Sequence, residues 1–329
     1  MNNKKRLYKI IGLFALVAFL FSIPSYVDNY FWLGLLILCC VNITLALSMG
    51  LQYYAGMFGL AHLAFMGIGA YTSALLVTRL GMSVWLCLLA GGVSALLWGV
   101  AFGYLVLRLR RMYFFMVSFL VAGVIETVFG HFWKDLFGGH EGLTNIPRPD
   151  PIIIGALNVD FSSYSHYYYL GLIIMLLTVL ILYRLNKSTY GMMFHAIRIA
   201  PDLVRHSGVN VLAYKVIAFS TGCFFAGIAG GFLAHFHGTI SPGDFGIWSC
   251  VVIQIFVVLG GQHYFWGPAL GAVIMTLVIG YLNKFGLYQQ IAYGSILVLT
   301  MLFIPNGLMS ILPKVVPFWQ KLPIVGRRQ

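Results

Sequence analysis

Hydrophobic residues gather in long stretches along the whole 329-residue chain, and short polar segments separate them. Ten such stretches can be drawn, at about 8–26, 32–51, 60–78, 84–107, 112–130, 166–183, 216–236, 247–261, 265–283 and 287–304. Most have the length that an α-helix needs to cross about 30 Å of hydrocarbon. The pattern predicts an all-α polytopic integral membrane protein, with about ten transmembrane helices in a single transmembrane domain, 1–329.

The basic residues predict how these helices are oriented, because Lys and Arg in short loops concentrate on the cytoplasmic side. If the amino terminus is cytoplasmic, 16 of the 20 basic residues lie inside, and only Arg79, Lys134, Arg148 and Lys284 lie outside. Six of the eight acidic residues also fall outside. Both termini are therefore expected in the cytoplasm.

Composition supports a membrane protein and argues against other classes. With 60% hydrophobic and 9% charged residues, a soluble chain would expose far too much apolar surface. The net charge of +12 does not indicate nucleic-acid binding, because the basic residues are scattered beside membrane segments. The basic start and first apolar stretch resemble a secretory signal, but without a convincing cleavage site we interpret them as a retained helix.

Metal and catalytic chemistry have little support in the sequence. The five cysteines all lie in apolar segments and lack the paired spacing of zinc or redox sites. His235 and His237 stand two apart, which would splay them on a helix, so no metal site is expected there. No catalytic constellation stands in a credible setting, and an enzyme is the least favoured class.

Two longer polar stretches interrupt the apolar pattern, an external region at 131–165 and a cytoplasmic loop at 184–215. In the inner loop, Pro201 suits the first position of a helix, Asp202 suits its positive first turn, and Gly208 suits a left-handed stop. These residues predict a short helix at 202–207. It is either a docking element or a plain interfacial helix against the lipid headgroups.

Glycines are the second recurring signal. The pairs Gly99–Gly103, Gly227–Gly231 and Gly267–Gly271 have the spacing that lets membrane helices approach closely. Further glycines crowd the third stretch, together with His62, and glycine-broken backbone at membrane depth survives only inside protein or along a watery path. The third stretch is therefore our candidate for a translocation path, although packing is the commoner role of any single glycine.

The source of energy follows from what the apolar stretches lack. Glu126 is the only carboxylate within them, whereas a proton- or sodium-driven carrier usually needs several ionisable groups. The chain also has no phosphate-binding Gly-rich loop ending in Gly-Lys-Ser/Thr. Either a separate ATPase docks on the helix predicted at 202–207, or the protein is a passive channel.

At this point several blocks of residues resemble a known family. The run from Gly56 to Thr72, GMFGLAHLAFMGIGAYT, resembles the signature of permease subunits of branched-chain amino acid ABC importers, the LivM-like family. Other blocks agree in order: LRLR at 107–110, GGHEGLTNIP at 138–147, AIR at 196–198 with GVN at 208–210, FFAGIAG at 224–230, ISP at 240–242, VLGG at 258–261, WGP at 266–268 and LG at 270–271. The resemblance runs from about Asn42 to Asn283.

The resemblance implies a heteromeric importer of leucine, isoleucine and valine in a bacterial or archaeal cytoplasmic membrane. This chain would be an ABC importer permease bundle beside a sister permease subunit, two cytoplasmic ATPase subunits and a periplasmic or lipid-anchored substrate-binding protein. ATP and Mg would bind the partner subunits, so this chain would bind no cofactor and would not itself be an enzyme.

Three sets of candidate site residues follow from the motifs and the resemblance together. The substrate pathway would include Gly56, Gly59, His62, Phe65, Gly67, Gly69, Tyr71 and Glu126. The ATPase-coupling surface would include Arg198, Pro201, Asp202, Arg205 and Gly208. The contact with the binding protein would include Gly138, Gly139, Glu141 and Gly142.

Some positions depart from the family's pattern, and two alternative functions stay open. Met57 and Gly59 stand where the family often has Gln and Ser, and Ile199 to Pro201 stand where it often has acidic residues. Glu126 lacks the Arg that often accompanies it in the fifth span. The alternatives are a permease for urea or short amides, and an ATP-independent secondary carrier or channel.

Overall fold

The computed structural model describes residues 17–26, 29–109, 111–154, 157–159, 161, 163–282, 288–303 and 307–310. Residues 17–22 are helical. The long helices that follow are α2 (Tyr30–Tyr54), α3 (His62–Leu80), α4 (Val84–Val106), α5 (Arg111–His131), α7 (Tyr164–Lys187), α10 (Val211–His237), α11 (Ile247–Gly260), α12 (Gly267–Leu282) and α13 (Tyr288–Phe303). The shorter elements are η1 (Ile23–Ser25), α6 (Lys134–Phe137), η2 (Gly139–Glu141), β1 (Ile152–Ile154), β2 (Leu157–Val159), α8 (Thr189–Ile199), α9 (Pro201–His206), η3 (Pro242–Phe245) and η5 (Leu308–Ser310).

The all-α polytopic class predicted from the sequence is confirmed. Seven of the described helical segments are long and apolar enough to cross a membrane, and α12 is a shorter apolar helix. Helices α12 and α13 fall on the last two predicted stretches. The first part of the first predicted stretch, 8–16, and both termini lie outside the described residues, so the cytoplasmic position of the termini stays a prediction.

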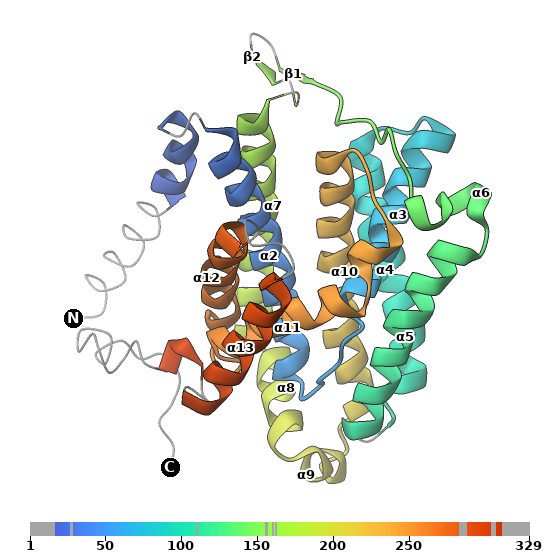
Figure 1. The fold of residues 1–329 in the computed structure, drawn as a ribbon. Coiled ribbons are helices and arrows are strands. Elements are labelled where there is room, and N and C mark those ends of the chain that lie inside the picture. Colours follow the sequence, from blue (N-terminus) through green and yellow to red (C-terminus); the bar gives the residue numbers. More distant parts are fainter. Residues whose placement is uncertain are drawn as a thin grey trace.

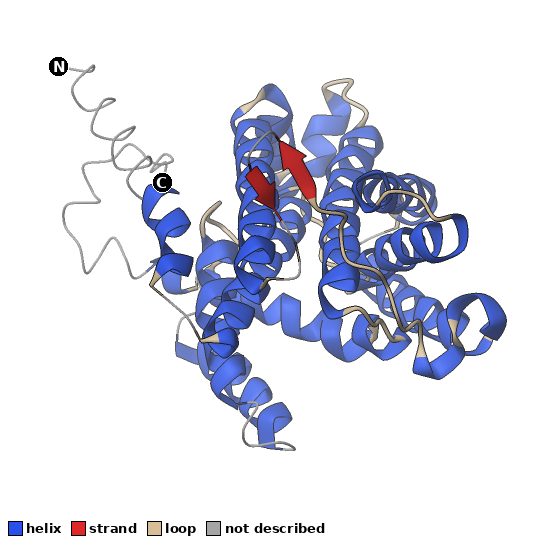
Figure 2. Cartoon of the chain, turned by 90° about the horizontal axis from the view of Figure 1, so that it is seen from above, coloured by secondary structure: helices blue, strands red, loops and turns tan. Residues whose placement is uncertain are grey.

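The predicted external region contains a small β-hairpin that sequence patterning did not foresee. Strands β1 and β2 pair antiparallel, with Ile152 opposite Val159 and Ile154 opposite Leu157. Figure 2 shows the hairpin lying over the ends of the helices, where it adds nothing to the transmembrane bundle.

Helix α10 stands between two groups of helices (Figure 1). On one side α2 packs with α7 and α12, and on the other side α3 packs with α4. Helix α10 contacts α2, α3 and α4, so it joins both groups. Helix α5 lies at the edge of the bundle in Figure 1, beside α3 and α11.

Glycines hold α3, α4 and α10 together by direct backbone contact. A Cβ atom on Gly91 of α4 would lie 2.6 Å from the carbonyl oxygen of Gly69 on α3. A Cβ on Gly227 of α10 would lie equally close, 2.6 Å, to the carbonyl oxygen of Gly91, and one on Gly69 would meet the backbone of Gly227. The close packing predicted for Gly227 is therefore confirmed, and the glycines that make it possible come from three helices.

Helix α11 begins inside the bundle and does not start at the end of α10. After α10 the chain turns back, and Figure 1 shows α11 starting at mid-height between α5 and α12. Phe245 of η3 packs on Gly67 of α3, where an added Cβ would lie 2.8 Å from the ring. The bounds 247–261 predicted from hydropathy are nearly correct, but the re-entrant start could not be read from the sequence.

Candidate functional site

A polar network joins three helices around His62, one of the candidate pathway residues. Its Nε2 lies 2.9 Å from Oγ of Ser48, and its Nδ1 lies 3.1 Å from Nε2 of Gln52. The Ser48 hydroxyl donates to the carbonyl of Leu45, so the Ser48 oxygen accepts from a protonated Nε2 of His62. Gln52 then donates one hydrogen to Nδ1 and one, over 3.4 Å, to the carbonyl oxygen of Phe219 on α10.

The network holds His62 in one orientation and one tautomer. The three side chains from Ser48, Gln52 and His62 are 0–3% exposed, and both imidazole nitrogens have partners. Buried polar groups in a membrane bundle must be satisfied within the protein, and here they tie α2, α3 and α10 together. In this conformation His62 acts as a buried link between helices, and its role in substrate passage stays a prediction.

The other pathway candidates on and before α3 face different neighbours. Gly59 approaches Phe114 of α5, and Phe65 packs edge-on against Phe219 of α10 with ring centroids 5.4 Å apart. Tyr71 lies between Phe129 of α5 and Phe245 of η3, and its buried hydroxyl has no hydrogen-bond partner among the described residues. The cluster that looked like one lining in the sequence is therefore spread around the helix.

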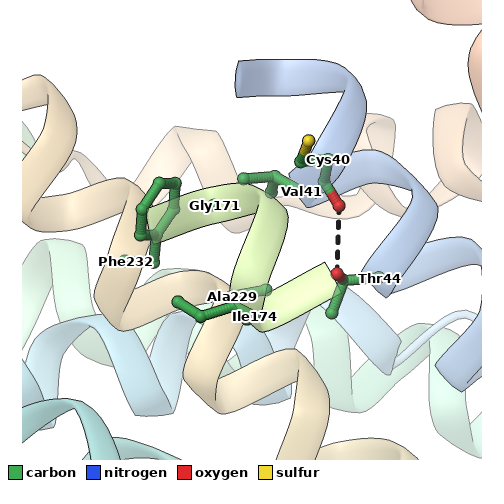
Figure 3. Close-up of a pocket in the computed structure, with 7 residues that line it drawn as sticks. All are labelled: Cys40, Val41, Thr44, Gly171, Ile174, Ala229 and Phe232. Carbon is green, nitrogen blue, oxygen red and sulfur yellow. Dashed lines mark hydrogen bonds between the residues drawn. The ribbon is translucent and has the colours of Figure 1, made fainter. Parts of the chain in front are cut away.

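A small void lies between three helices of the bundle. The void drawn in Figure 3 has a volume of about 10 Å³ and is lined by Cys40, Val41, Thr44, Gly171, Ile174, Ala229 and Phe232. Its lining comes from α2, α7 and α10. The Thr44 hydroxyl donates a hydrogen bond to the carbonyl oxygen of Cys40. A void of this size holds at most about one water molecule, so it is no passage for a larger solute.

A larger groove lies along α5, beside the start of α11. It has a volume of about 470 Å³ and is lined by Phe119, Leu120, Gly123, Val124, Thr127, Val128, Phe132 and Ile247. Glu126 of α5 is not one of the lining residues. Its carboxylate lies against Gly246, next to the lining residue Ile247, where an added Cβ on Gly246 would be 2.6 Å from Oε2. Gly246 is the residue before α11 and carries no side-chain cap, so the carboxylate meets the positive end of a helix.

The coupling-loop prediction is confirmed in its local structure. Helix α9 covers residues 201–206, within one residue of the prediction, and begins with Pro201 and then Asp202. Gly208 has a φ of +82°, the left-handed conformation that was expected of it. None of the residues of α9 is buried, so the helix projects from the bundle with Arg205 on its surface.

Arg198 does not lie on the exposed helix with the other coupling candidates. It sits in the last turn of α8, where its guanidinium donates to Nδ1 of His263 in the α11–α12 turn. A Cβ on Gly56, which has a φ of +76°, would lie 3.2 Å from Cα of Arg198. Sequence reasoning missed His263, although it lies between two of the motif blocks, at 258–261 and 266–268.

The external candidates form a rigid platform. Gly138, Gly139 and Gly142 have φ values of +77°, +65° and +75°, which require glycine at these tight turns. Leu143 then pairs with Ile240 in an antiparallel bridge.

A buried histidine holds this platform on the bundle, a role that the sequence pattern did not predict. Nδ1 of His235 donates to the carbonyl of Pro147 over 2.7 Å, and its Nε2 lies 2.9 Å from the Ser73 hydroxyl. A second pair, His131 and His140, lies at the surface with the two Nε2 atoms 3.1 Å apart. The loop next to Glu141 is therefore fixed to α3, α5 and α10.

This arrangement defines a multi-pass membrane permease: an apolar helical bundle with an ordered platform at one end and a projecting helix at the other. A family model described as "Branched-chain amino acid transport system / permease component" matches residues 31–305. The chain belongs to this family, so it is a transport component and not an enzyme, and it resides in the inner membrane.

Two curated relatives align with most of the length of this chain. The permease protein LivM of the high-affinity branched-chain amino acid transport system of Escherichia coli (strain K12) is 28% identical over 288 residues, which cover 81% of this chain and 68% of the relative. The LivM protein of Salmonella typhimurium (strain LT2) is 30% identical over 294 residues, with the same coverage of 81% and 68%. No solved structure matches the chain significantly.

Proposed function

We propose that this chain is one of two membrane subunits of an ATP-driven importer of leucine, isoleucine and valine. The observation that carries the proposal is the projecting helix α9, because a carrier that works alone has no use for an exposed docking helix in its longest inner loop. The membership of the family, and the names of the LivM relatives, support the substrate class.

The surface of α9 suits a protein partner. Leu203 of α9 and Ile199, the last residue of α8, are 69% and 71% exposed, and the charged Asp202 and Arg205 lie beside them in the sequence. Exposed apolar side chains with a charged rim are typical of an interaction site. We assign this surface to one of the two ATPase subunits, whose ATP and Mg supply the energy.

A sister permease would cover the exposed side of α5. In the most apolar segment of α5 only 22% of the residues are buried, whereas in the most apolar segment of α10 67% are buried. This weakly packed helix nevertheless carries Glu126, and a carboxylate within a membrane helix usually faces protein or water, because lipid does not solvate it. A second membrane subunit on this side would shield Glu126 and close the groove on α5.

The closed groove would suit a branched aliphatic amino acid. Its lining is mostly apolar, and Glu126 beside it supplies a carboxyl group that can accept hydrogen bonds from the ammonium group of the substrate. The apolar lining favours an aliphatic side chain over urea or a short amide, which would bury polar groups without partners.

The platform at the opposite end from α9 suits the substrate-binding protein. Its glycine turns at Gly138, Gly139 and Gly142 fix the backbone, and Glu141 is exposed beside them. A pre-ordered surface binds with less loss of entropy than a mobile loop. We therefore assign delivery of the substrate to this platform.

Uptake of labelled leucine into vesicles would test the function. The vesicles would contain this chain with its sister permease, ATPases and binding protein, with and without ATP, and with isoleucine, valine or urea as competitor. We expect uptake that needs ATP and that isoleucine and valine compete. Competition by urea alone would change the substrate, and uptake indifferent to ATP would contradict an ATP-driven importer.

A further inference from the structure

Three segments that are distant in the sequence meet at Arg198 on the predicted cytoplasmic side. Arg198 lies in the last turn of α8, which ends at Ile199, and Ala200 separates α8 from α9. The backbone of Gly56, from the α2–α3 connection, lies against Arg198, and His263 in the α11–α12 turn accepts its hydrogen bond. The base of α9 is thus tied to two other parts of the bundle.

The hydrogen bond requires a neutral imidazole. Arginine has only donors, so Nδ1 of His263 must be the acceptor and its proton must sit on Nε2. Hydrogen bonds from a charged donor are about twice as strong as those between neutral groups. The His263 side chain is exposed, so its removal would leave the apolar core unchanged.

The α11–α12 turn, which carries His263, is held by backbone hydrogen bonds. The α11–α12 turn is closed by hydrogen bonds from the amide of Tyr264 to Gly261 and from the amide of Gly267 to Tyr264, at 3.1 and 3.0 Å. Beyond the turn, the backbones of α11 and α12 touch, since a Cβ on Gly271 would meet the carbonyl oxygen of Phe256. The two helices are therefore packed backbone to backbone as one hairpin.

The far end of this hairpin lies at the groove on α5. Helix α11 has 14 residues, so it spans about 21 Å at 1.5 Å per residue. It begins directly after Gly246, against which the carboxylate of Glu126 is packed. A displacement of the α11–α12 turn would therefore reach Glu126 and the groove.

We propose that His263 is a positioning residue for transport: its hydrogen bond with Arg198 passes movement of α9 to the α11–α12 hairpin and so to the Glu126 end of α11. This inference rests on the proposed docking of an ATPase at α9. It adds the α11–α12 turn to the coupling machinery, and it assigns the transmission to one identified contact.

The experiment compares His263→Leu, which removes the acceptor, with His263→Asn, whose amide oxygen can take the place of Nδ1. Each variant is assembled with all its partner subunits in vesicles, and leucine uptake and ATP hydrolysis are measured together. We expect His263→Leu to keep its bound ATPases but to lose about tenfold in leucine transported per ATP, as loss of a charged hydrogen bond would cause. His263→Asn should retain most of the wild-type ratio.

Arg198→Gln supplies an independent check. If the bond carries the coupling, the double variant Arg198→Gln with His263→Leu should be no worse than either single variant. Additive losses, equal losses in His263→Leu and His263→Asn, or an unchanged transport ratio in His263→Leu would each overturn the inference. Failure of the docking proposal would look different: ATPases would bind normally and hydrolyse ATP normally when α9 itself is disrupted.

Discussion

At the scale of single residues, two histidines of this chain join distant segments by hydrogen bonds, but they do so in different environments. His62 is buried, with both ring nitrogens bonded to side chains of α2. His263 is exposed, and it offers only an acceptor to Arg198. The first can hardly change its protonation state without breaking a buried network, whereas the second can titrate in response to the solution.

Transport per ATP should therefore fall at acid pH on the cytoplasmic side. Although much of the His263 side chain is exposed, partial desolvation of its imidazole lowers its pKa below the usual value of about 6.5, and electrostatic interaction with Arg198 and then His195 lowers the pKa further. The neutral form, and the stability it contributes, is fully present above that usual value and is lost as the pH falls through the lowered pKa.

The measurement is uptake per ATP in vesicles whose cytoplasmic-side pH is varied from about 8 to about 5. The wild-type ratio should be flat at the upper end and drop at the lower end. His263→Asn cannot titrate, so it should show no such drop. An equal drop in both proteins would assign the pH effect to another group.

At the scale of elements, glycines set how close the helices come and where they end. Gly69, Gly91 and Gly227 bring three helices into backbone contact, whereas Gly208 matters for its dihedral angle, because a Cβ there would meet nothing within 4 Å. Similar glycines in the sequence thus serve different physical purposes.

Gly69→Ala should destabilise the bundle, because its Cβ would meet the backbone of Gly227, which cannot rotate away. Overpacking of this kind costs about 1–3 kcal/mol. The measurement is the apparent melting temperature of the purified chain. Gly34→Ala in α2 is the matched control, since its Cβ would meet nothing within 4 Å and should leave the melting temperature unchanged or slightly raised. Equal effects of the two substitutions would contradict the contact.

Gly208→Pro should abolish stimulation of ATP hydrolysis by the loaded binding protein. Proline cannot adopt the φ of +82° that ends the turn after α9, so the helix would lose its orientation. Gly208→Asn is the control, because asparagine tolerates the left-handed conformation and should keep most of the stimulation. Normal stimulation in the proline variant would show that α9 is not the docking element.

At the scale of the whole molecule, α5 is the least buried of the seven described helices that are long and apolar enough to cross a membrane, and it carries the membrane carboxylate. Helix α5 packs against the edges of α3 and α11, while α10 is surrounded by three helices. Because Glu126 lies on this weakly packed helix, we expect the assembly proposed above, and not the single chain, to enclose the path.

Leu120→Trp on α5 should therefore weaken association with the sister permease. Leu120 is 62% exposed and lines the groove, so the larger side chain of tryptophan would prevent close contact with another subunit there. Leu97→Trp on α4 is the matched control, with 61% exposure on another side of the bundle. Co-purification of the sister subunit should fall in the first variant only. An equal loss in both, or in neither, would place the subunit contact elsewhere.

The sequence by itself determined the features that depend on neighbours along the chain. The lengths of the apolar stretches predicted the helices, because a span is defined by continuous hydrophobicity. The proline start and left-handed glycine stop predicted α9 to within one residue, because helix ends depend on local dihedral preferences and hydrogen bonds. The motif blocks predicted the family.

Only the tertiary structure decided how distant residues combine. Arg198 and His263 are 65 positions apart and became partners because α8 and the α11–α12 turn end at the same side. The glycines around α3 separated onto different neighbours, because successive helical residues point in different directions. The re-entrant start of α11 likewise depends on Phe245 packing on Gly67, a contact that no local pattern encodes.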